Sequence, residues 1–443
     1  MAIIERPTYL EKLIKARRNG RVKVITGIRR CGKSFLLSNI YRRYLLEEGV
    51  PNDCILDIAL DQRAYASLRN PNELFAYVME CIDETTQYYV FIDEIQLSFK
   101  VKRDDIDESK VAPEDRDLLY TTFYDVLNDL ASHQNIDVYV TGSNSKMLSS
   151  DIVTNFRDRG TEIRMWPLSF SEYYAFSDLE KSDAWQSYIV YGGMPLAVLE
   201  PNMRDRETYL KHLFDTVYRA DIVERYGLGD DHLLDQLAKE VASAVGSLTN
   251  PTKLANAMNT AFHAKGGNQT NDKTIKKYLD TLVDAFVFLK AERYDVKGKR
   301  YFEYPTKYYA TDVGLRNALL NFRQVEETHL MENIVFNELC LRGFSVDVGA
   351  IRIVQTTNGK RSDALHEIDF VVNHGSQKAY IQCAWSIDSE AKRKQERLPL
   401  LKVDDFFRKY VITGGAQQPW TDEDGITYMG VIAFLLDPLS IAP

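Results

Sequence analysis

Gly27-Ile28-Arg29-Arg30-Cys31-Gly32-Lys33-Ser34 matches the pattern G-x-x-x-x-G-K-S/T at every fixed position. It follows a strand-like run, Val22–Thr26, and precedes a segment of helical periodicity that extends from Ser34 to about Glu48. In this context the glycines let successive backbone N–H groups point at phosphate oxygens, and the helix N-terminus adds the positive end of its dipole. The sequence therefore predicts a loop that binds the phosphates of a nucleoside triphosphate, made of Gly27, Ile28, Arg29, Arg30, Cys31, Gly32, Lys33, Ser34 and Phe35.

The chemistry of such a loop assigns roles to individual side chains. Lys33 is expected to reach the β- and γ-phosphates, and Ser34 to ligate Mg²⁺. A second apolar run, Tyr88–Ile92, ends in the acidic pair Asp93 and Glu94. An acidic pair at a strand end is common by itself, but downstream of a phosphate-binding loop it indicates metal and water chemistry. We expect Asp93 to bind magnesium through water and Glu94 to polarise the attacking water.

A third strand-like run ends in small polar side chains. Val138–Thr141 is followed by Gly142, Ser143 and Asn144. A polar residue that lies between the two preceding strands can contact the γ-phosphate and report its loss, and Ser143 and Asn144 are our candidates for this sensor. Thr141 is the alternative sensor, and a plain turn after the strand is the structural alternative.

Two arginines follow shortly afterwards, Arg157 and Arg159. A guanidinium that reaches a γ-phosphate across an interface stabilises charge in the transition state, as arginine fingers do. Either arginine is a candidate for this catalytic role. Surface salt bridges with Asp158 or Glu162 are the alternative.

Strand-like and helical segments alternate over the first 150 residues. Besides the segments above, Cys54–Ala59 is strand-like, and Pro71–Asp83 and Tyr120–Ser132 have helical periodicity. This alternation predicts an α/β fold with a parallel sheet and helices on both of its faces. Lys100–Asp117 is rich in charged residues and is expected to be a solvated loop or insertion, with a partner-contacting arm as the alternative.

Composition places the chain among globular proteins. It has 443 residues, of which 45% are hydrophobic and 27% charged, and two or three domains are expected at this length. The five cysteines show no disulfide or zinc-binding spacing, and no apolar run is long enough to span a membrane. We expect a cytoplasmic protein without membrane contact. The net charge of -9 restricts any nucleic-acid contact to a local basic patch.

The later part of the chain has a different pattern. Helical stretches extend to about Val245, with a sharp turn at Gly192 and Gly193. Two short amphipathic helices and a hairpin follow, an order that suggests a winged helix-turn-helix, at Thr252–Phe262, Lys273–Val283 and Phe286–Tyr309. A helix at Glu332–Arg342 and several strands then imply another α/β unit, the strands being Ile351–Gln355, Glu367–Val372, Tyr380–Ala384, Tyr410–Thr413 and Gly430–Leu436.

Six stretches together resemble a family of bacterial and archaeal AAA-type ATPases that carry a C-terminal domain of unknown function. The matching stretches are Gly27–Ser34, Phe91–Gln96, Val140–Asn144, Pro167–Glu172, Tyr191–Pro195 and Ala310–Arg316. The resemblance implies ATP as the nucleotide and an AAA-type core. It also implies a helical or winged-helix middle and a C-terminal domain similar to restriction-endonuclease-like nucleases. The expected domain bounds are 1–165, 166–325 and 326–443.

Nucleases of that type use an acidic residue on a helix, an aspartate on a strand and a Glu-x-Lys on the next strand. Glu332 or Glu338 fits the helical acid, and Asp369 fits the strand aspartate. Gln382 and Ala384 stand where the glutamate and the lysine are expected. We therefore predict a nuclease-like fold without nuclease activity. Replacement of the lysine by Lys378 or Lys392 is the alternative.

DNA binding is left open by the winged-helix pattern. Six basic residues lie on its second helix and on the hairpin turn, and together they could neutralise several phosphates: Lys273, Lys276, Lys277, Lys297, Lys299 and Arg300. Five nearby tyrosines are equally consistent with a packing role for this region: Tyr294, Tyr301, Tyr304, Tyr308 and Tyr309.

The leading hypothesis is an AAA-type ATPase that uses ATP and Mg²⁺ as a nucleotide-dependent switch for its attached domains. A protein partner or a second copy of the chain is a further candidate ligand. The first alternative is a DNA-binding protein regulated by ATP, and the second is an active ATP-dependent nuclease.

Overall fold

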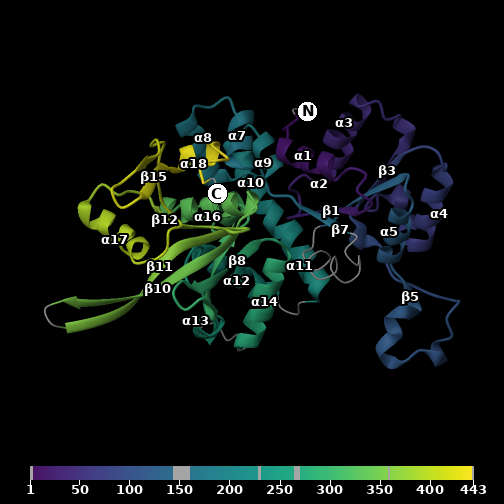
Figure 1. Ribbon diagram of the computed structural model, residues 1–443. Coiled ribbons are helices and arrows are strands. Elements are labelled where there is room, and N and C mark those ends of the chain that lie inside the picture. The colour runs from purple at the N-terminus through teal and green to yellow at the C-terminus, as the bar shows by residue number, and fades with distance from the viewer. Residues whose placement is uncertain (1–2, 143–159, 228–230, 264–269, 358–359, 442–443) are drawn as a thin grey trace. The chain divides into compact units, whose positions relative to one another are not determined.

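The computed structural model describes residues 3–142, 160–227, 231–263, 270–357 and 360–441 (Figure 1). The chain divides into two compact units, Met1–Trp166 and Pro167–Pro443, called unit 1 and unit 2 below. Among the described residues, no helix combines the length and hydrophobicity that crossing a bilayer requires.

Unit 1 contains a sheet of five parallel strands in the order β2-β3-β6-β1-β7. Their bounds are Val22–Thr26 for β1, Ile55–Ala59 for β2, Tyr88–Asp93 for β3, Ile136–Thr141 for β6 and Gly160–Arg164 for β7. The prediction of an α/β fold with a parallel sheet is confirmed for this unit. The strand β7 was not predicted from the sequence, because it is short and carries two charged residues, Glu162 and Arg164.

Helices cover both faces of this sheet. On one face, α4 (Pro71–Cys81) and α5 (Phe123–Ser132) pack Leu74 and Leu127 against the β3 residues Val90 and Ile92 and the β6 residue Val138. On the opposite face lies the helical segment that follows the phosphate-binding loop. It consists of α2 (Lys33–Phe35), a π-helical segment (Leu36–Tyr41) and α3 (Arg42–Glu47).

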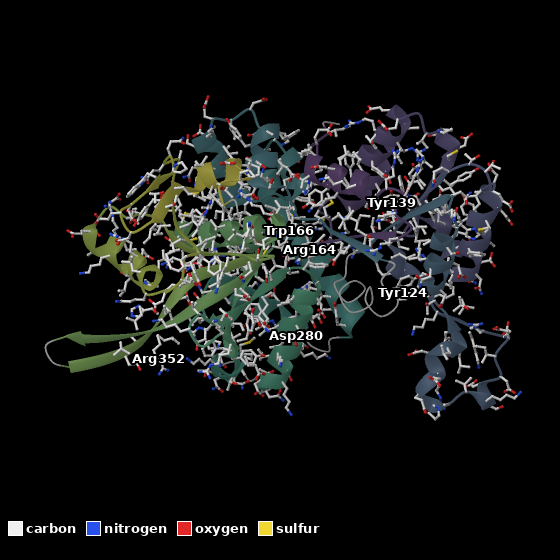
Figure 2. All side chains as sticks on the ribbon, in the orientation of Figure 1. Tyr124, Tyr139, Arg164, Trp166, Asp280 and Arg352 are labelled. Atoms are coloured by element: carbon white, nitrogen blue, oxygen red, sulfur yellow. The ribbon has the colours of Figure 1, made fainter. Side chains whose placement is uncertain are left out.

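Aromatic rings join that helical segment to the sheet. The Tyr41 ring centroid is 5.9 Å from that of Phe91 and 5.1 Å from that of Tyr139, which is labelled in Figure 2. The alternation along β3 therefore places Phe91 on the face opposite to Val90 and Ile92. Unit 1 also contains the N-terminal helix α1 (Pro7–Ala16).

The charged segment of unit 1 contains only short elements. Two-residue strands, β4 (Val101–Lys102) and β5 (Tyr120–Thr121), pair antiparallel, and 3₁₀ turns lie between them. The predicted helix start at Tyr120 is wrong, because Thr122 caps α5 through a capping box with Asp125.

Unit 2 begins with helices. The bounds are Phe170–Phe176 for α7, Lys181–Tyr191 for α8, Pro195–Leu199 for α9, Met203–His212 for α10, Arg219–Tyr226 for α11, Asp231–Ser243 for α12, Pro251–His263 for α13, Asp272–Asp284 for α14, Val313–Leu319 for α15 and Glu327–Leu341 for α16. The predicted helices at Thr252–Phe262 and Lys273–Val283 correspond to α13 and α14.

The sheet of unit 2 is mixed and has eight strands in the order β14-β15-β13-β12-β11-β10-β8-β9. Their bounds are Phe288–Asp295 for β8, Arg300–Ala310 for β9, Ser345–Thr357 for β10, Lys360–His374 for β11, Gln377–Ala384 for β12, Arg408–Thr413 for β13, Trp420–Thr421 for β14 and Ile426–Gly430 for β15. The predicted hairpin corresponds to β8 and β9, and β8 pairs parallel with β10. The two strands predicted as a wing thus share one sheet with the C-terminal strands.

Both faces of this second sheet are also covered. The α16 ring of Phe336 lies 5.9 Å from that of Phe370 on β11. On the opposite face, Leu400 of α17 (Glu390–Leu401) packs in one apolar cluster with Ile368 and Val411. The paired strands β10 and β11 extend beyond the sheet as a two-stranded ribbon that carries Arg352 (Figures 1 and 2).

The prediction of a strand at Gly430–Leu436 is wrong. β15 ends at Gly430, and Val431–Leu436 forms the helix α18, of which four residues are buried. An apolar run of this length has no periodicity that separates a buried strand from a buried helix, so sequence pattern alone misassigns it.

Three of the stretches that carry the family resemblance meet in unit 2. Ser169 and Glu172 form a capping box at the start of α7, and the Leu168 N–H donates to the Gly193 carbonyl at 2.8 Å. The Gly193 N–H in turn donates to Asp312 Oδ2 at 2.7 Å. A Cβ on Gly314 would lie 2.0 Å from the Tyr191 carbonyl oxygen. These stretches therefore form one structural junction.

Candidate nucleotide-binding site

Three polar side chains lie at the carboxyl edge of the sheet in unit 1. They are Thr26, Asp93 and Thr141, which end β1, β3 and β6. β6 lies between the other two strands and pairs parallel with both. The register brings Thr141 opposite Ile25 of β1. In open α/β sheets, ligands bind outside this edge.

The loop between β1 and α2 depends on its glycines. Gly27 has φ +137°, and a Cβ at this position would lie 2.0 Å from the Met165 carbonyl oxygen. Gly32, which precedes α2, is left-handed with φ 100°. Arg30 has φ 65° as well. The loop therefore reverses its direction within a few residues and approaches the backbone after β7 closely.

Lys33 lies folded back over this loop. Its Nζ donates to the carbonyl oxygens of Gly27 and Ile28, both at 3.0 Å, and its side chain is buried. The Cys31 side chain points into the protein and is fully buried. Ser34 and Phe35, in contrast, are exposed at the start of the helix.

The loop and the acidic strand meet at one contact. Ser34 Oγ donates to Asp93 Oδ1 at 2.8 Å, and the Thr141 hydroxyl donates to the same oxygen. Burial raises the pKa of Asp93, and the nearby Glu94 and Asp61 raise it further, although the bonds from Thr141 and Ser34 lower it. Asp93 therefore lies where a positive charge would be stabilised.

Glu94 adopts an unusual backbone conformation directly after β3. Its φ and ψ are 53° and 47°, in the left-handed region, and its N–H donates to Thr141 Oγ1 at 3.0 Å. The Gln96 side-chain amide donates to the Glu94 carboxylate. A non-glycine residue in this region is strained, and such strain persists only where the surroundings fix it. Thr141 and Gln96 supply that fixation.

Arg6 is a site residue that was not predicted from the sequence. This buried arginine donates to the Trp166 carbonyl oxygen at 2.7 Å and to the Cys31 carbonyl oxygen at 3.4 Å. It therefore connects the phosphate-binding loop to the backbone that follows β7. Trp166 also lies under the Arg164 guanidinium, whose carbon is 4.6 Å from the ring centroid (Figure 2). No sequence motif marks Arg6, because its partners are backbone atoms far along the chain.

Several predicted residues lie outside the described part of the chain. These are the sensor candidates Ser143 and Asn144 and the arginines Arg157 and Arg159. Glu162, which was considered as a salt-bridge partner for these arginines, lies on β7. It accepts a hydrogen bond from Thr26 Oγ1 at 2.9 Å. Within the described residues, Thr141 is the predicted sensor candidate that the structure brings to Asp93.

The donor set suits Mg²⁺. One hydroxyl and one carboxylate, from Ser34 at the start of α2 and Asp93 at the end of β3, are in contact. Magnesium prefers oxygen ligands, and in nucleotide sites it is held by one or two protein groups together with substrate phosphates. In the described residues, no group of three or more His, Cys, Asp and Glu side chains is arranged to hold a metal ion.

Comparisons with known proteins identify an AAA domain in this part of the chain. A family model described as an AAA domain matches residues 19–174, and one described as a domain of unknown function (DUF8612) matches residues 182–326. An uncharacterized protein of Haemophilus influenzae is 32% identical over 98% of this chain and 99% of its own length. The chain belongs to this family of AAA-domain proteins. The AAA domain implies nucleotide binding.

Two further similarities are more distant. An uncharacterized protein of Methanocaldococcus jannaschii is 26% identical over 88% of this chain and 82% of its own length. A Walker-type ATPase of Pyrococcus abyssi is 14% identical, with a TM-score of 0.45 over 72% of this chain and 96% of that one. Neither matching family model is described as a nuclease.

The structure places the predicted nuclease residues in two groups. Glu332 on α16 and Asp369 on β11 both lie near Lys307 of β9, whereas Glu338 pairs with Arg342 at 2.8 Å. Gln382 accepts a hydrogen bond from the Asp369 N–H at 3.4 Å. Of the two candidate replacement lysines, Lys378 lies against aromatic rings and Lys392 pairs with Glu396 at 2.5 Å.

The basic residues of the predicted winged helix also fall into two groups, one on α14 and one on the hairpin. On α14, Lys273, Lys276 and Lys277 are all exposed, and Lys276 Nζ lies 3.9 Å from Glu303 Oε1 on the hairpin. On the hairpin, Lys297 lies 3.6 Å from Asp404, and Arg300 lies 3.6 Å from Asp295. Of the five tyrosines, Tyr308 and Tyr309 are buried, as the packing alternative predicts, and Tyr301 is exposed.

Proposed function

We propose that this chain binds ATP with Mg²⁺ at the carboxyl edge of the sheet in unit 1 and hydrolyses its γ-phosphate. The observation that carries the proposal is the 2.8 Å contact between Ser34 Oγ and Asp93 Oδ1. That contact brings together the hydroxyl of the phosphate-binding loop and the carboxylate of the acidic strand, which is the pair that metal-dependent phosphoryl transfer requires.

Each residue of the site has its own role in phosphate binding, metal binding or water orientation. The loop at Gly27–Ser34 binds the phosphates through its backbone N–H groups, and Lys33 exchanges its bonds to loop carbonyls for phosphate oxygens. Ser34 and Asp93 hold Mg²⁺, which when bound neutralises charge that develops on the phosphates. Glu94 accepts a hydrogen bond from the attacking water and orients it, since it lies next to Asp93 at the same edge.

Thr141 is proposed as the residue that couples the metal site to the water site. Its hydroxyl donates to Asp93 and accepts from the Glu94 N–H, so a shift of either residue changes both contacts. If loss of the γ-phosphate shifts Asp93 or Glu94, the Thr141 hydroxyl would transmit that shift to β6. This coupling supports the proposal that ATP turnover acts as a switch for unit 2, with a protein partner or a second copy of the chain as the receiver.

The experiment that tests hydrolysis compares three variants of the full chain. Glu94→Gln should keep ATP affinity and lose most hydrolysis, because the amide no longer accepts the water proton. Lys33→Ala should lose both, because it removes the phosphate contact. Glu73→Gln, an exposed glutamate on α4, is the matched control and should behave as wild type. Wild-type hydrolysis by Glu94→Gln would exclude Glu94 from the proposed role.

DNA binding regulated by ATP is the second candidate. The three exposed lysines of α14 favour it, because they lie together on the solvent face of the helix. The paired charges of the hairpin do not add to this patch. If DNA is bound here, a plot of the logarithm of the DNA-binding constant against the logarithm of the salt concentration should have a negative slope of several units. Changing Lys273 and Lys277 to Ala should make that slope shallower by about two. A pull-down with the Glu94→Gln protein trapped with ATP, assayed in parallel for protein and for nucleic acid, separates the switch from the DNA-binding regulator.

An active nuclease is the third candidate, and we expect no cutting. Gln382 and Ala384 lack the carboxylate and the ammonium that such chemistry uses. Plasmid cleavage with Mg²⁺ that Asp369→Ala abolishes would establish nuclease activity and overturn this expectation.

A further inference from the structure

A lysine of β9 lies inside a group of carboxylates in unit 2. Lys307 Nζ is 3.0 Å from Glu332 Oε1 on α16, 2.7 Å from Glu367 Oε1 on β11 and 4.0 Å from Asp369 Oδ1 on the same strand. The side chains of Lys307, Glu332 and Asp369 are only 3%, 10% and 9% exposed. We call these four residues the Lys307 cluster.

Neighbouring donors fix the carboxylates in place. The Tyr309 hydroxyl donates to Glu332 Oε1 at 2.7 Å, and the Cys383 N–H donates to Asp369 Oδ2 at 2.7 Å. Tyr309 and Lys307 share Glu332 Oε1, whereas the Cys383 bond uses the Asp369 oxygen that does not face Lys307. The geometry of the cluster is therefore set by β9 and β12 and does not depend on Lys307 alone.

The charges in the cluster depend on one another. Burial and the nearby Glu332 raise the pKa of Asp369 well above its usual range, and Lys307 opposes this rise. Burial by itself would lower the pKa of Lys307, but Glu332, Asp369 and Glu367 outweigh burial and raise it. Lys307 therefore remains an ammonium. Its positive charge offsets the free-energy cost of burying these carboxylates.

Carboxylates from different elements that converge on one cation are typical of divalent metal sites in proteins. Here Lys307 supplies the positive charge at the point of convergence, and the neutral amide of Gln382 lies beside Asp369. We propose that the Lys307 ammonium is the built-in cation of this cluster and occupies the position at which its carboxylates would otherwise bind a divalent metal ion.

This inference rests on the geometry of unit 2 and is independent of ATP hydrolysis in unit 1. It also gives a chemical reason for the expected lack of nuclease activity. An ammonium already bound to Glu332 and Glu367 blocks the oxygens that a metal ion would need. Neither Lys378 nor Lys392 takes part in this arrangement.

The test is Mn²⁺ binding by the full chain without nucleotide, measured by equilibrium dialysis with Mn²⁺ electron paramagnetic resonance. All proteins carry Asp93→Asn, which removes the metal site proposed in unit 1. The parent should show no Mn²⁺ that depends on Asp369. Lys307→Ser should gain about one Mn²⁺ per chain, and adding Asp369→Asn should abolish the gain. Lys290→Ser is the matched control, because it removes a β8 lysine that pairs with Glu292 outside the cluster.

Two results obtained with folded proteins would overturn the proposal. One is Asp369-dependent Mn²⁺ in the parent, which would mean that the lysine accompanies a metal ion and does not replace it. The other is a folded Lys307→Ser that gains no Mn²⁺, which would make the cluster an ion pair without latent metal affinity. If Lys307→Ser folds only during refolding with Mn²⁺, the proposal is supported. Failure to fold even with Mn²⁺ counts against it, because the metal then cannot replace the ammonium.

Discussion

The carboxylate of Asp312 accepts a hydrogen bond from the backbone N–H of Gly193, 119 residues earlier in the chain, at 2.7 Å. Its other oxygen accepts from the Leu315 N–H at 2.9 Å and so caps α15. One buried side chain therefore fixes the start of a helix and the turn between α8 and α9 together. This relationship joins two of the stretches on which the family resemblance rests, because the carboxylate of one accepts a hydrogen bond from the backbone of the other.

Asp312→Ala should destabilise unit 2 by about 3 kcal/mol, because it leaves two buried N–H groups without an acceptor and removes a helix cap. Urea unfolding followed by tryptophan fluorescence measures the change. Asn202→Ala is the matched control. It removes an exposed cap of α10 with a single contact to the Arg204 N–H, and should cost about 1 kcal/mol. Equal losses in the two variants would contradict the linking role of Asp312.

The stability of unit 2 should also depend on pH through Asp312. Burial raises the pKa of this carboxyl from 3.8 to about 6, although the N–H groups of Gly193 and Leu315 oppose the rise. The folded state therefore holds the proton more tightly than the unfolded state. The contribution is fully present below pH 3.8 and is lost as pH rises through about 6.

The measurement is the stability of wild type relative to Asp312→Asn, from about pH 4 to about pH 7. Asparagine resembles the protonated acid and does not titrate. Wild type should lose up to about 3 kcal/mol relative to this variant as pH rises over that range. A constant difference would show that Asp312 does not change protonation in the folded protein.

The sequence predicts the site in unit 1 better than it predicts unit 2, for physical reasons. Gly27–Ser34 requires a particular backbone, so its pattern implies both β1 and the helix that follows. Thr141 could not be distinguished from its neighbours, since only the pairing of β6 between β1 and β3 brings its hydroxyl to Asp93. Lys307 was missed because no local pattern reveals that β9 supplies a cation to residues of α16 and β11.

Gly27→Ala should impair nucleotide binding by about 100-fold or more, because the new Cβ would lie 2.0 Å from the Met165 carbonyl oxygen and displace the loop. Gly20→Ala separates this steric effect from backbone strain. Gly20 has φ +70°, but a Cβ there meets no atom within 4 Å. That control should lose a little stability and keep its affinity for ATP, measured by isothermal titration calorimetry. Equal affinity losses in both variants would mean that strain alone decides the effect.

Thr141→Val tests whether one hydroxyl joins the proposed metal and water sites. Valine has nearly the same shape, but it can neither donate to Asp93 nor accept from the Glu94 N–H, whose bond to Thr141 Oγ1 is 3.0 Å long. Glu94 then loses one of the two contacts that hold its left-handed conformation in place. We expect hydrolysis to fall about tenfold or more while ATP affinity changes much less, because the phosphate-binding loop is untouched. Thr141→Ser keeps the hydroxyl and should retain most of the activity. Wild-type turnover by Thr141→Val would show that Asp93 and Glu94 are positioned without it, and the route from γ-phosphate loss to β6 would then need another residue.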